Sequence, residues 1–301
     1  MKYLVTGGAG FIGSNLVDEL VSKGHEVVIV DNESAESNSE FYWNKNAKKY
    51  LNDINDFSSL NSIFSKEKPD MVFHLAAEAR IQPTINEPHK ACLTNFVGTC
   101  NVLQASRENG VKRVIYSSTS SAYGLKNDPP LKEDMPKDCL NPYSVSKTAG
   151  EELCKVYYKI YRVETVTLRY FNVYGNREPI KGPYAPVVGL FVRQKKEGKP
   201  FTIVGDGLQT RDFTHINDVV AANILSATTK NEKALGEIFN IGTGESHTVL
   251  SIAHAIGGDF TYLPARSGEA RHTLANNNKA RKILGWKPKK GLKTYLKNID
   301  F

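Results

Sequence analysis

The sequence predicts an α/β fold, in which a doubly wound parallel sheet carries a smaller α/β lobe. Short runs rich in Val, Ile and Leu alternate with stretches of helical periodicity, and these runs fall at 2–6, 26–31, 71–77, 113–116 and 163–170. Such alternation is typical of βαβ crossovers, which place helices on both faces of a parallel sheet. The chain has 301 residues, which at about 150 residues per domain suggests two lobes.

Composition narrows the class of protein. The 39 basic and 32 acidic residues give a formal net charge of +7, but the lysines are dispersed, which argues against nucleic acid as a partner. No segment approaches about 18 consecutive apolar residues, and the chain enters a strand directly after Met1, so we expect no membrane span and no signal peptide. The four cysteines show neither metal-ligand spacing nor a pairing pattern. We therefore expect no metal and a reducing, cytoplasmic location.

Residues 1–31 are the stretch around which the chain is organised. They indicate a strand at 2–6, a glycine-rich turn at 7–13, a helix that ends at Gly24, and a strand that ends at Asp31. Glycines in such a turn let a pyrophosphate approach the backbone and the helix N-terminus, because no Cβ intervenes. An acidic residue after the second strand binds the adenosine ribose and repels a 2′-phosphate, which favours NAD over NADP. This context predicts a Rossmann-type NAD site in preference to an ordinary structural turn.

The next segment, residues 32–46, is polar and without a period, so we expect a loop over the adenosine end of the cofactor. Phe41 and Trp43 either cover the adenine or anchor this loop, and anchoring is favoured. Asp53 follows a short strand-like run and is expected to meet the adenine amino group, with Ile54 against the ring.

Two further strands end in residues that suit a ligand site. The run at 71–77 ends in small residues, a helix is expected at 88–109, and the run at 113–116 leads into five hydroxyl residues at 117–121. Ligands of open α/β sheets bind outside the carboxyl ends of the strands. Thr119 is therefore expected beside the nicotinamide.

The next predicted helix begins near Asn141 and carries Tyr143 and Lys147 one turn apart on one face. A free tyrosine has a pKa of about 10, which is too high for a base at neutral pH. A nearby ammonium favours the phenolate and lowers that pKa. Each residue alone has an ordinary alternative, such as a half-buried aromatic or a solvated charge, but the context upstream favours a catalytic pair.

Regularity falls after the strand at 163–170. Residues 176–199 are rich in Gly, Pro and Tyr and are taken as the start of a substrate lobe. We assign residues 1–172 to the NAD-binding domain, to which the chain returns at about 208–241, and residues 173–301 mainly to the substrate lobe. No flexible linker separates the two, so we expect them to pack together with a cleft between them.

The sequence resembles a known family, the extended short-chain dehydrogenase/reductases, and within them the nucleotide-sugar 4-epimerases of the UDP-glucose and UDP-N-acetylglucosamine type. The resemblance covers nearly the whole chain. It rests on the segments at 7–13, 74–77, 95–99, 116–124, Tyr143 with Lys147, 169–175, 205–207, 211–213 and 266–269.

The resemblance implies a reaction. Tyr143 would remove the proton from the sugar 4-hydroxyl, with Thr119 hydrogen-bonded to the same oxygen and Lys147 completing the catalytic set. Hydride would pass to NAD⁺, the 4-keto sugar would turn over on its pyrophosphate, and hydride would return to the opposite face. The implied substrate is a UDP-linked hexose, either the UDP-glucose/UDP-galactose pair or the N-acetylhexosamine pair.

Binding residues follow from the same resemblance. The cofactor contacts are expected from Gly7, Gly10, Phe11, Ile12, Gly13, Asp31, Asn32, Asp53, Ile54, Leu75, Ala76, Ala77, Asn95, Tyr143, Lys147 and Tyr170. The substrate contacts are expected from Ser120, Asn172, Arg211, Arg266, Glu269 and Thr273. The two arginines would clamp the diphosphate, because a planar guanidinium fork suits phosphate oxygens, and ion pairs with Asp212 and Glu269 are their alternative role.

Three positions discriminate within the family. Nucleotide-sugar 4,6-dehydratases resemble this chain but carry an Asp-Glu pair where Ser120 and Ser121 stand, because eliminating water needs a second acid and base. Dehydration is therefore disfavoured, as is the decarboxylase branch, which also has a glutamate at the second place. Thr273 stands where glucose-restricted epimerases have a bulky tyrosine, which leaves room for an N-acetyl group.

The family also implies a homodimer. The contact would form through helices around 91–108 and 143–161, with Tyr157, Tyr158 and Tyr161 at a partly apolar interface. Two alternatives to the epimerase stay open. Another nucleotide-sugar enzyme of the family, such as a reductase, would show a net change in cofactor redox state, whereas an inactive NAD-binding regulatory module would not need the catalytic set.

Overall fold

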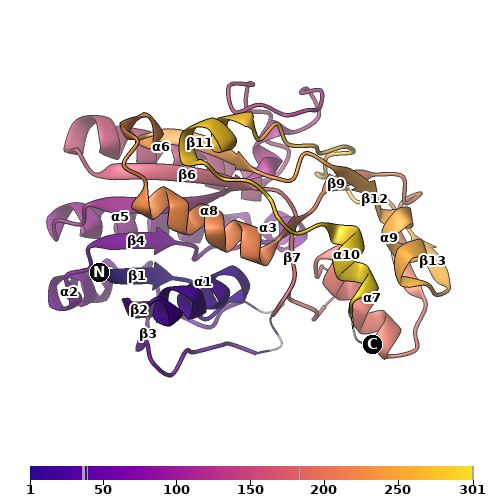
Figure 1. The fold of residues 1–301 in the computed structure, drawn as a ribbon, viewed down its shortest axis with the longest axis horizontal. Coiled ribbons are helices and arrows are strands. Elements are labelled where there is room, and N and C mark those ends of the chain that lie inside the picture. The colour runs from indigo at the N-terminus through magenta and orange to yellow at the C-terminus, as the bar shows by residue number, and fades with distance from the viewer. Residues whose placement is uncertain (36–37, 39, 183, 300–301) are drawn as a thin grey trace.

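A seven-stranded, all-parallel sheet forms the centre of the computed structural model, which describes residues 1–35, 38, 40–182 and 184–299. Its strand order is β11-β6-β5-β4-β1-β2-β3 (Figure 1). The strands are β1 (Lys2–Thr6), β2 (Glu26–Asp31), β3 (Lys48–Leu51), β4 (Met71–His74), β5 (Arg113–Thr119), β6 (Glu164–Tyr170) and β11 (Glu237–Ile241). The predicted doubly wound parallel sheet is confirmed, and its order reverses between β1 and β4, which is where such sheets bind ligands.

Helices cover both faces of this sheet. The helices α1 (Phe11–Ser22) and α8 (Ile216–Thr228) pack on one face, whereas α2 (Phe57–Glu67), α5 (Gly98–Glu108) and α6 (Pro142–Tyr161) pack on the other. Each face of the sheet has its own hydrophobic core: the first core lies under α1 and α8, and the second core lies under α2, α5 and α6. Along β1, Tyr3 and Val5 point into the first core and Leu4 into the second, and all three are buried. A strand buried on both faces reads as an apolar run without alternation.

The single helix predicted at 88–109 is three consecutive pieces. These are α4 (Pro88–Cys92), a π-helical turn η1 (Leu93–Val97) and α5. The strand predicted at 71–77 ends at His74, because residues 75–80 leave the sheet before the short helix α3 (Ile81–Asn86). That early end creates the loop that later forms one wall of the site.

A third, smaller core lies beyond the carboxyl ends of the strands (Figure 1). It contains the helices α7 (Val187–Lys196), α9 (Val249–Ile256) and α10 (Leu292–Lys297) and the strand pair β8 (Phe201–Val204) and β13 (Phe260–Leu263). Phe191 stacks on Phe201 with ring centroids 4.9 Å apart. Two further strand pairs complete the strands: β7 (Val173–Tyr174) pairs with β10 (Thr214–His215), and β9 (Thr210–Asp212) pairs with β12 (Ser246–Thr248). The remaining short helical turns are η2 (Ser120–Tyr123), η3 (Glu232–Ala234) and η4 (Ala280–Leu284).

No helix in the described part of the chain is long and apolar enough to cross a membrane.

Candidate active site

A cleft of about 960 Å³ opens at the carboxyl ends of the strands, between the sheet and the smaller core. Most of the residues that the sequence singles out line it. These are Gly7, Gly10, Phe11, Ile12, Gly13, Asp31, Asn32, Ile54, Leu75, Ala76, Ala77, Thr119, Ser120, Tyr143, Lys147, Tyr170, Asn172, Arg211, Arg266, Glu269 and Thr273. Segments far apart in the sequence therefore face one another across one cavity.

The glycine-rich turn fits a pyrophosphate. Gly7 has a φ of +67° and sits so close to the loop after β4 that a Cβ there would lie 2.7 Å from the Ala76 nitrogen. A Cβ on Gly13 would collide with the Gly7 carbonyl oxygen. Gly10 is the N-cap of α1 and provides no side-chain cap, so the first N–H groups of that helix remain available for an anion.

Asp31 closes the adenosine side of this turn. Its Oδ2 accepts a hydrogen bond from the Ala9 backbone N–H at 3.0 Å, and its Oδ1 accepts one from Glu33 at 2.9 Å. Burial raises the pKa of Asp31, and these backbone N–H groups partly offset the rise. The glycine-rich turn offers backbone N–H donors to a pyrophosphate, and the fixed carboxyl of Asp31 offers acceptors to ribose hydroxyls, which together suit NAD.

The loop at 32–46 is anchored as the sequence suggests, although residues 36, 37 and 39 lie outside the described residues. Trp43 packs against the first core and its indole N–H donates to Glu33 at 2.6 Å. Phe41, in contrast, lines the cleft. The two aromatics thus have different surroundings.

Two residues predicted to contact the cofactor do not line the cleft. Asn95 is fully buried. Its amide oxygen accepts a hydrogen bond from the Glu78 backbone N–H at 2.8 Å, and its amide nitrogen donates to the Glu78 carbonyl at 3.0 Å and to Ser146 Oγ at 3.1 Å. Asp53 accepts hydrogen bonds from Asn32 and from the Asn55 backbone N–H. Asn95 braces the loop after β4, and Asp53 braces the adenosine loop, so both act behind the cleft wall.

Helix α6 places Tyr143 and Lys147 because its first turn is well capped. Asn141 and Ser144 form a reciprocal capping box, and Pro142 occupies the first helical turn. Burial raises the pKa of Tyr143, whereas a hydrogen bond with Thr119 and the positive charge of Arg80 lower it. The cation that acts on Tyr143 here is thus Arg80, whereas the sequence suggested Lys147.

Lys147 lies deeper than a solvated lysine. Its side chain is 2% exposed, and its ammonium sits 4.3 Å from the centroid of the Tyr116 ring. Burial lowers the pKa of Lys147 to about 7, and the nearby Cys154 and Glu151 offset part of that shift. A protein ammonium buried in this way is poised to lose its proton near neutral pH.

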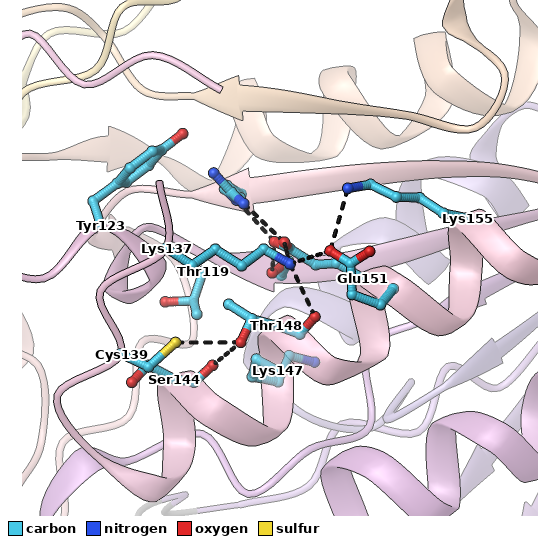
Figure 2. A network of polar contacts seen from close by, with 12 residues as sticks. Thr119, Tyr123, Lys137, Cys139, Ser144, Lys147, Thr148, Glu151 and Lys155 are labelled. Atoms are coloured by element: carbon cyan, nitrogen blue, oxygen red, sulfur yellow. Dashed lines mark hydrogen bonds and ion pairs between the residues drawn. The ribbon is translucent and has the colours of Figure 1, made fainter. Parts of the chain in front are cut away.

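A buried charge network supports these residues from behind (Figure 2). The Glu151 carboxylate, one helical turn after Lys147, accepts two hydrogen bonds from Arg169 at 2.8 Å and one from Ser118 at 2.6 Å. The Lys137 ammonium lies 3.2 Å from the same carboxylate. Because Ser118 adjoins Thr119, this network ties the end of β5 to α6.

The opposite wall carries the predicted substrate residues. The Asn172 amide donates to the Asp212 carbonyl at 3.0 Å and lies 3.5 Å from Thr273 Oγ1. The Arg211 guanidinium lies 3.8 Å from the Glu269 carboxylate, and Arg211 also lines the cleft. This arginine therefore forms an ion pair and faces the cleft at the same time. The Arg266 guanidinium lies 5.2 Å from the Tyr184 ring centroid.

Sequence reasoning missed Arg80 and Glu178. Arg80 lies in the loop after β4 and lines the cleft. Glu178 is a buried residue of the irregular segment between β7 and α7. A single arginine after a strand end and a single glutamate in an irregular segment carry no motif. Only the position of Arg80 at a carboxyl end of the sheet pointed to a ligand.

Comparisons with known proteins agree with this geometry. The family model described as "NAD dependent epimerase/dehydratase family" matches residues 3–242. The UDP-glucose 4-epimerase of Mycolicibacterium smegmatis is 34% identical over 312 residues, which cover 100% of this chain and 98% of that protein. The crystal structure of the UDP-glucose 4-epimerase of Thermotoga maritima with UDP-glucose has a TM-score of 0.93 at 37% identity, covering 99% of this chain and 96% of that one. The UDP-glucose 4-epimerase of Thermus thermophilus in complex with NAD has a TM-score of 0.89 at 32% identity, covering 98% and 96%. The chain belongs to the NAD dependent epimerase/dehydratase family.

Proposed function

We propose that this chain is an NAD-dependent 4-epimerase that inverts carbon 4 of a UDP-linked hexose. The observation that carries the proposal is the meeting of Thr119 and Tyr143 with the glycine-rich turn in one cleft, opposite Arg211 and Arg266. The similarity to UDP-glucose 4-epimerases over the whole chain supports the same reaction.

Tyr143 and Thr119 supply the proton chemistry. Burial holds the pKa of Tyr143 above its usual value, and the hydrogen bond with Thr119 and the charge of Arg80 offset part of that rise. The phenolate of Tyr143 takes the proton of the sugar 4-hydroxyl. The glycine-rich turn would hold the cofactor, which would accept the hydride of carbon 4 as NAD⁺ and return it as NADH. After the 4-keto sugar has turned over, Tyr143 returns the proton to the oxygen at carbon 4.

The substrate wall sets the binding mode. Arg211 and Arg266 hold the diphosphate, so the sugar can rotate while the nucleotide stays bound. Ser120 and Ser121 provide hydroxyls but no carboxyl group, and therefore no acid or base for eliminating water. Thr273 is a small, buried side chain at the cleft, which admits hexoses with either a hydroxyl or an N-acetyl group on carbon 2.

A homodimer completes the proposal. Leu93, Phe96 and Val97 on η1 and Val156 and Ile160 on α6 are exposed apolar side chains on neighbouring elements. A second copy of the chain is the partner that would cover them through a four-helix contact. The four cysteines are free thiols, which suits the reducing cytoplasm that we propose as the compartment.

The test is epimerisation by the purified protein. We expect bound nicotinamide, and equilibration of UDP-galactose with UDP-glucose, of UDP-N-acetylgalactosamine with UDP-N-acetylglucosamine, or of both, followed by proton NMR. Tyr143→Phe removes the general base and should lower kcat by about 10²–10⁴-fold.

The matched control is Tyr262→Phe, because Tyr262 is an exposed tyrosine on β13 that does not line the cleft. It should keep the wild-type rate. Failure to equilibrate either pair, or a Tyr143→Phe protein as active as the Tyr262→Phe control, would remove the basis of the proposal.

A further inference from the structure

Arg80 is a cation without a counter-ion in the wall of the cleft. It lies in the loop between β4 and α3, its side chain is half-buried, and its Nε is buried without a hydrogen-bond partner. Among the described residues it forms no ion pair within 4.0 Å. An unpaired guanidinium withdrawn from water is costly, and a ligand that pairs with it recovers that cost.

The neighbour of Arg80 locates it relative to the sugar. Its charge acts on the phenol of Tyr143, and the Tyr143 phenolate would in turn attract the guanidinium. Under the proposed function, Tyr143 marks the oxygen on carbon 4. Because Arg80 and Tyr143 line the same cleft, the substituents next to carbon 4, on carbons 3 and 5, are the ones that we expect within reach of Arg80.

The acid that the guanidinium feels most, Glu178, does not neutralise it. Glu178 is 9% exposed, and its carboxyl accepts hydrogen bonds from the backbone N–H groups of Gly175 and Gly189, the latter in the first turn of α7. Burial raises the pKa of Glu178 to about 8, which keeps this carboxyl largely protonated at neutral pH. The charge on Arg80 is thus left for a ligand.

Several other cations of the cleft already have partners or places, among them Lys90, whose ammonium lies 3.3 Å from the Glu78 carboxylate. Arg211 is paired with Glu269 and Arg266 lies over Tyr184, both on the wall assigned to the diphosphate. The Lys147 ammonium lies 4.3 Å from the centroid of the Tyr116 ring. Arg80, in contrast, has a buried Nε without a hydrogen-bond partner, so its guanidinium is available to an anionic group of the ligand.

We propose that Arg80 binds a carboxylate carried by the hexose beside carbon 4, so that this chain prefers acidic nucleotide sugars over neutral ones. The inference rests on the proposed 4-epimerase function. The guanidinium fork matches a carboxylate in a bidentate pair, and such charge-assisted hydrogen bonds discriminate strongly against a substrate that lacks the acid. The carboxylate stands either on carbon 5, as in a hexuronic acid, or on an ether at carbon 3.

The experiment compares substrates across variants. We expect kcat/KM for UDP-glucuronate or for UDP-N-acetylmuramate to exceed that for UDP-glucose and UDP-N-acetylglucosamine by at least about tenfold in the wild type. Which acidic sugar is preferred distinguishes carbon 5 from carbon 3. Arg80→Met removes a charge that acts on Tyr143 and should slow every substrate, but it should also lower the ratio of kcat/KM for the acidic sugar to that for the neutral sugars by about 10- to 100-fold. Arg80→Lys should retain part of the preference.

Arg271→Met is the matched control, because Arg271 does not line the cleft and pairs with Asp206 at 2.6 Å. It should leave every ratio unchanged. A wild type that prefers neutral sugars, or an Arg80→Met protein that loses the same factor on all substrates, overturns the inference. Direct binding of the same four sugars by calorimetry separates the two proposals: a tenfold preference for the acid that Arg80→Met abolishes supports the inference even without turnover, and equal affinities contradict it.

Discussion

At the residue scale, Lys147 holds an amine where burial works against its charge. The pKa of this group is lowered to about 7 in the folded protein, against about 10.4 for a free lysine. Between these two values the unfolded chain binds a proton that the folded chain does not. The free energy of unfolding therefore rises with pH through this window, by about 1.4 kcal/mol per pH unit from this group alone.

This linkage gives a prediction for the cofactor-free protein. Lys147→Met removes the titrating amine, so the variant should be more stable than the wild type near pH 7, and that advantage should shrink by roughly 2–3 kcal/mol between pH 7 and pH 9. Urea unfolding of both proteins at the two pH values measures it. Lys155→Met is the control, since Lys155 lies on the exposed side of the same helix. A wild type and Lys147→Met variant with parallel pH dependence would contradict a depressed pKa at Lys147.

Residue types set how much of the site the sequence could predict. Gly7, Gly13 and Asp31 belong to one local unit of strand, turn and helix, and Tyr143 and Lys147 are one helical turn apart. Spacing together with this upstream context identified them. Arg80 and Glu178 come together only through the packing of segments about a hundred residues apart. No local pattern encodes such a contact.

At the element scale, the sequence predicted least well which residues of a helix are buried and which are exposed. The family resemblance implied a dimer contact through this helix, and the tyrosines at 157, 158 and 161 were all expected at that partly apolar interface. In the structure Tyr157 is 6% exposed and packs in the second core, where its hydroxyl donates to Gln104, and Tyr158 packs against Gly236. Tyr161 alone is exposed, at 39%. The period of a helix shows which residues share a face, but the neighbours decide which face is covered.

The exposed face of α6 carries the prediction about assembly. Ile160 is 65% exposed on α6, so Ile160→Glu would place a carboxylate in the proposed apolar contact and should convert a dimer into a monomer. Sedimentation velocity measures the change. Leu51→Glu on β3 is the matched control, because Leu51 is 72% exposed on an edge strand of the sheet away from these helices, and it should leave the mass unchanged. A wild-type monomer at micromolar concentration would remove the homodimer from the proposal.

Elements also explain why the helix at 88–109 was predicted as one piece. Its apolar spacing is helical throughout, and the π-turn at Leu93–Val97 inserts no Pro or Gly that would mark a break. The turn lies where buried Asn95 reaches the loop after β4, whose backbone its amide holds. A long-range hydrogen bond of this kind has no signature in the local sequence.

At the scale of the whole molecule, the order of the strands makes the site. The reversal between β1 and β4 separates the glycine-rich turn from the loop that carries Arg80, and the smaller core closes the space between them. Alternation of strands and helices predicted the sheet. The arrangement of the substrate wall could not be predicted from the sequence, because hydrogen bonds between residues far apart in the chain hold it together. Examples are the bonds from the Leu131 N–H to the Leu274 carbonyl and from the Asn141 amide to the Gly268 carbonyl.

The central claim is that hydride leaves carbon 4 and returns to the same carbon without meeting water. Epimerisation of a UDP-hexose in D₂O tests it most directly, with the product examined by NMR and mass spectrometry. We predict an inverted product that carries protium at carbon 4, because the cleft holds the transferred hydrogen throughout the turnover. Deuterium at carbon 4 of the product would contradict the account.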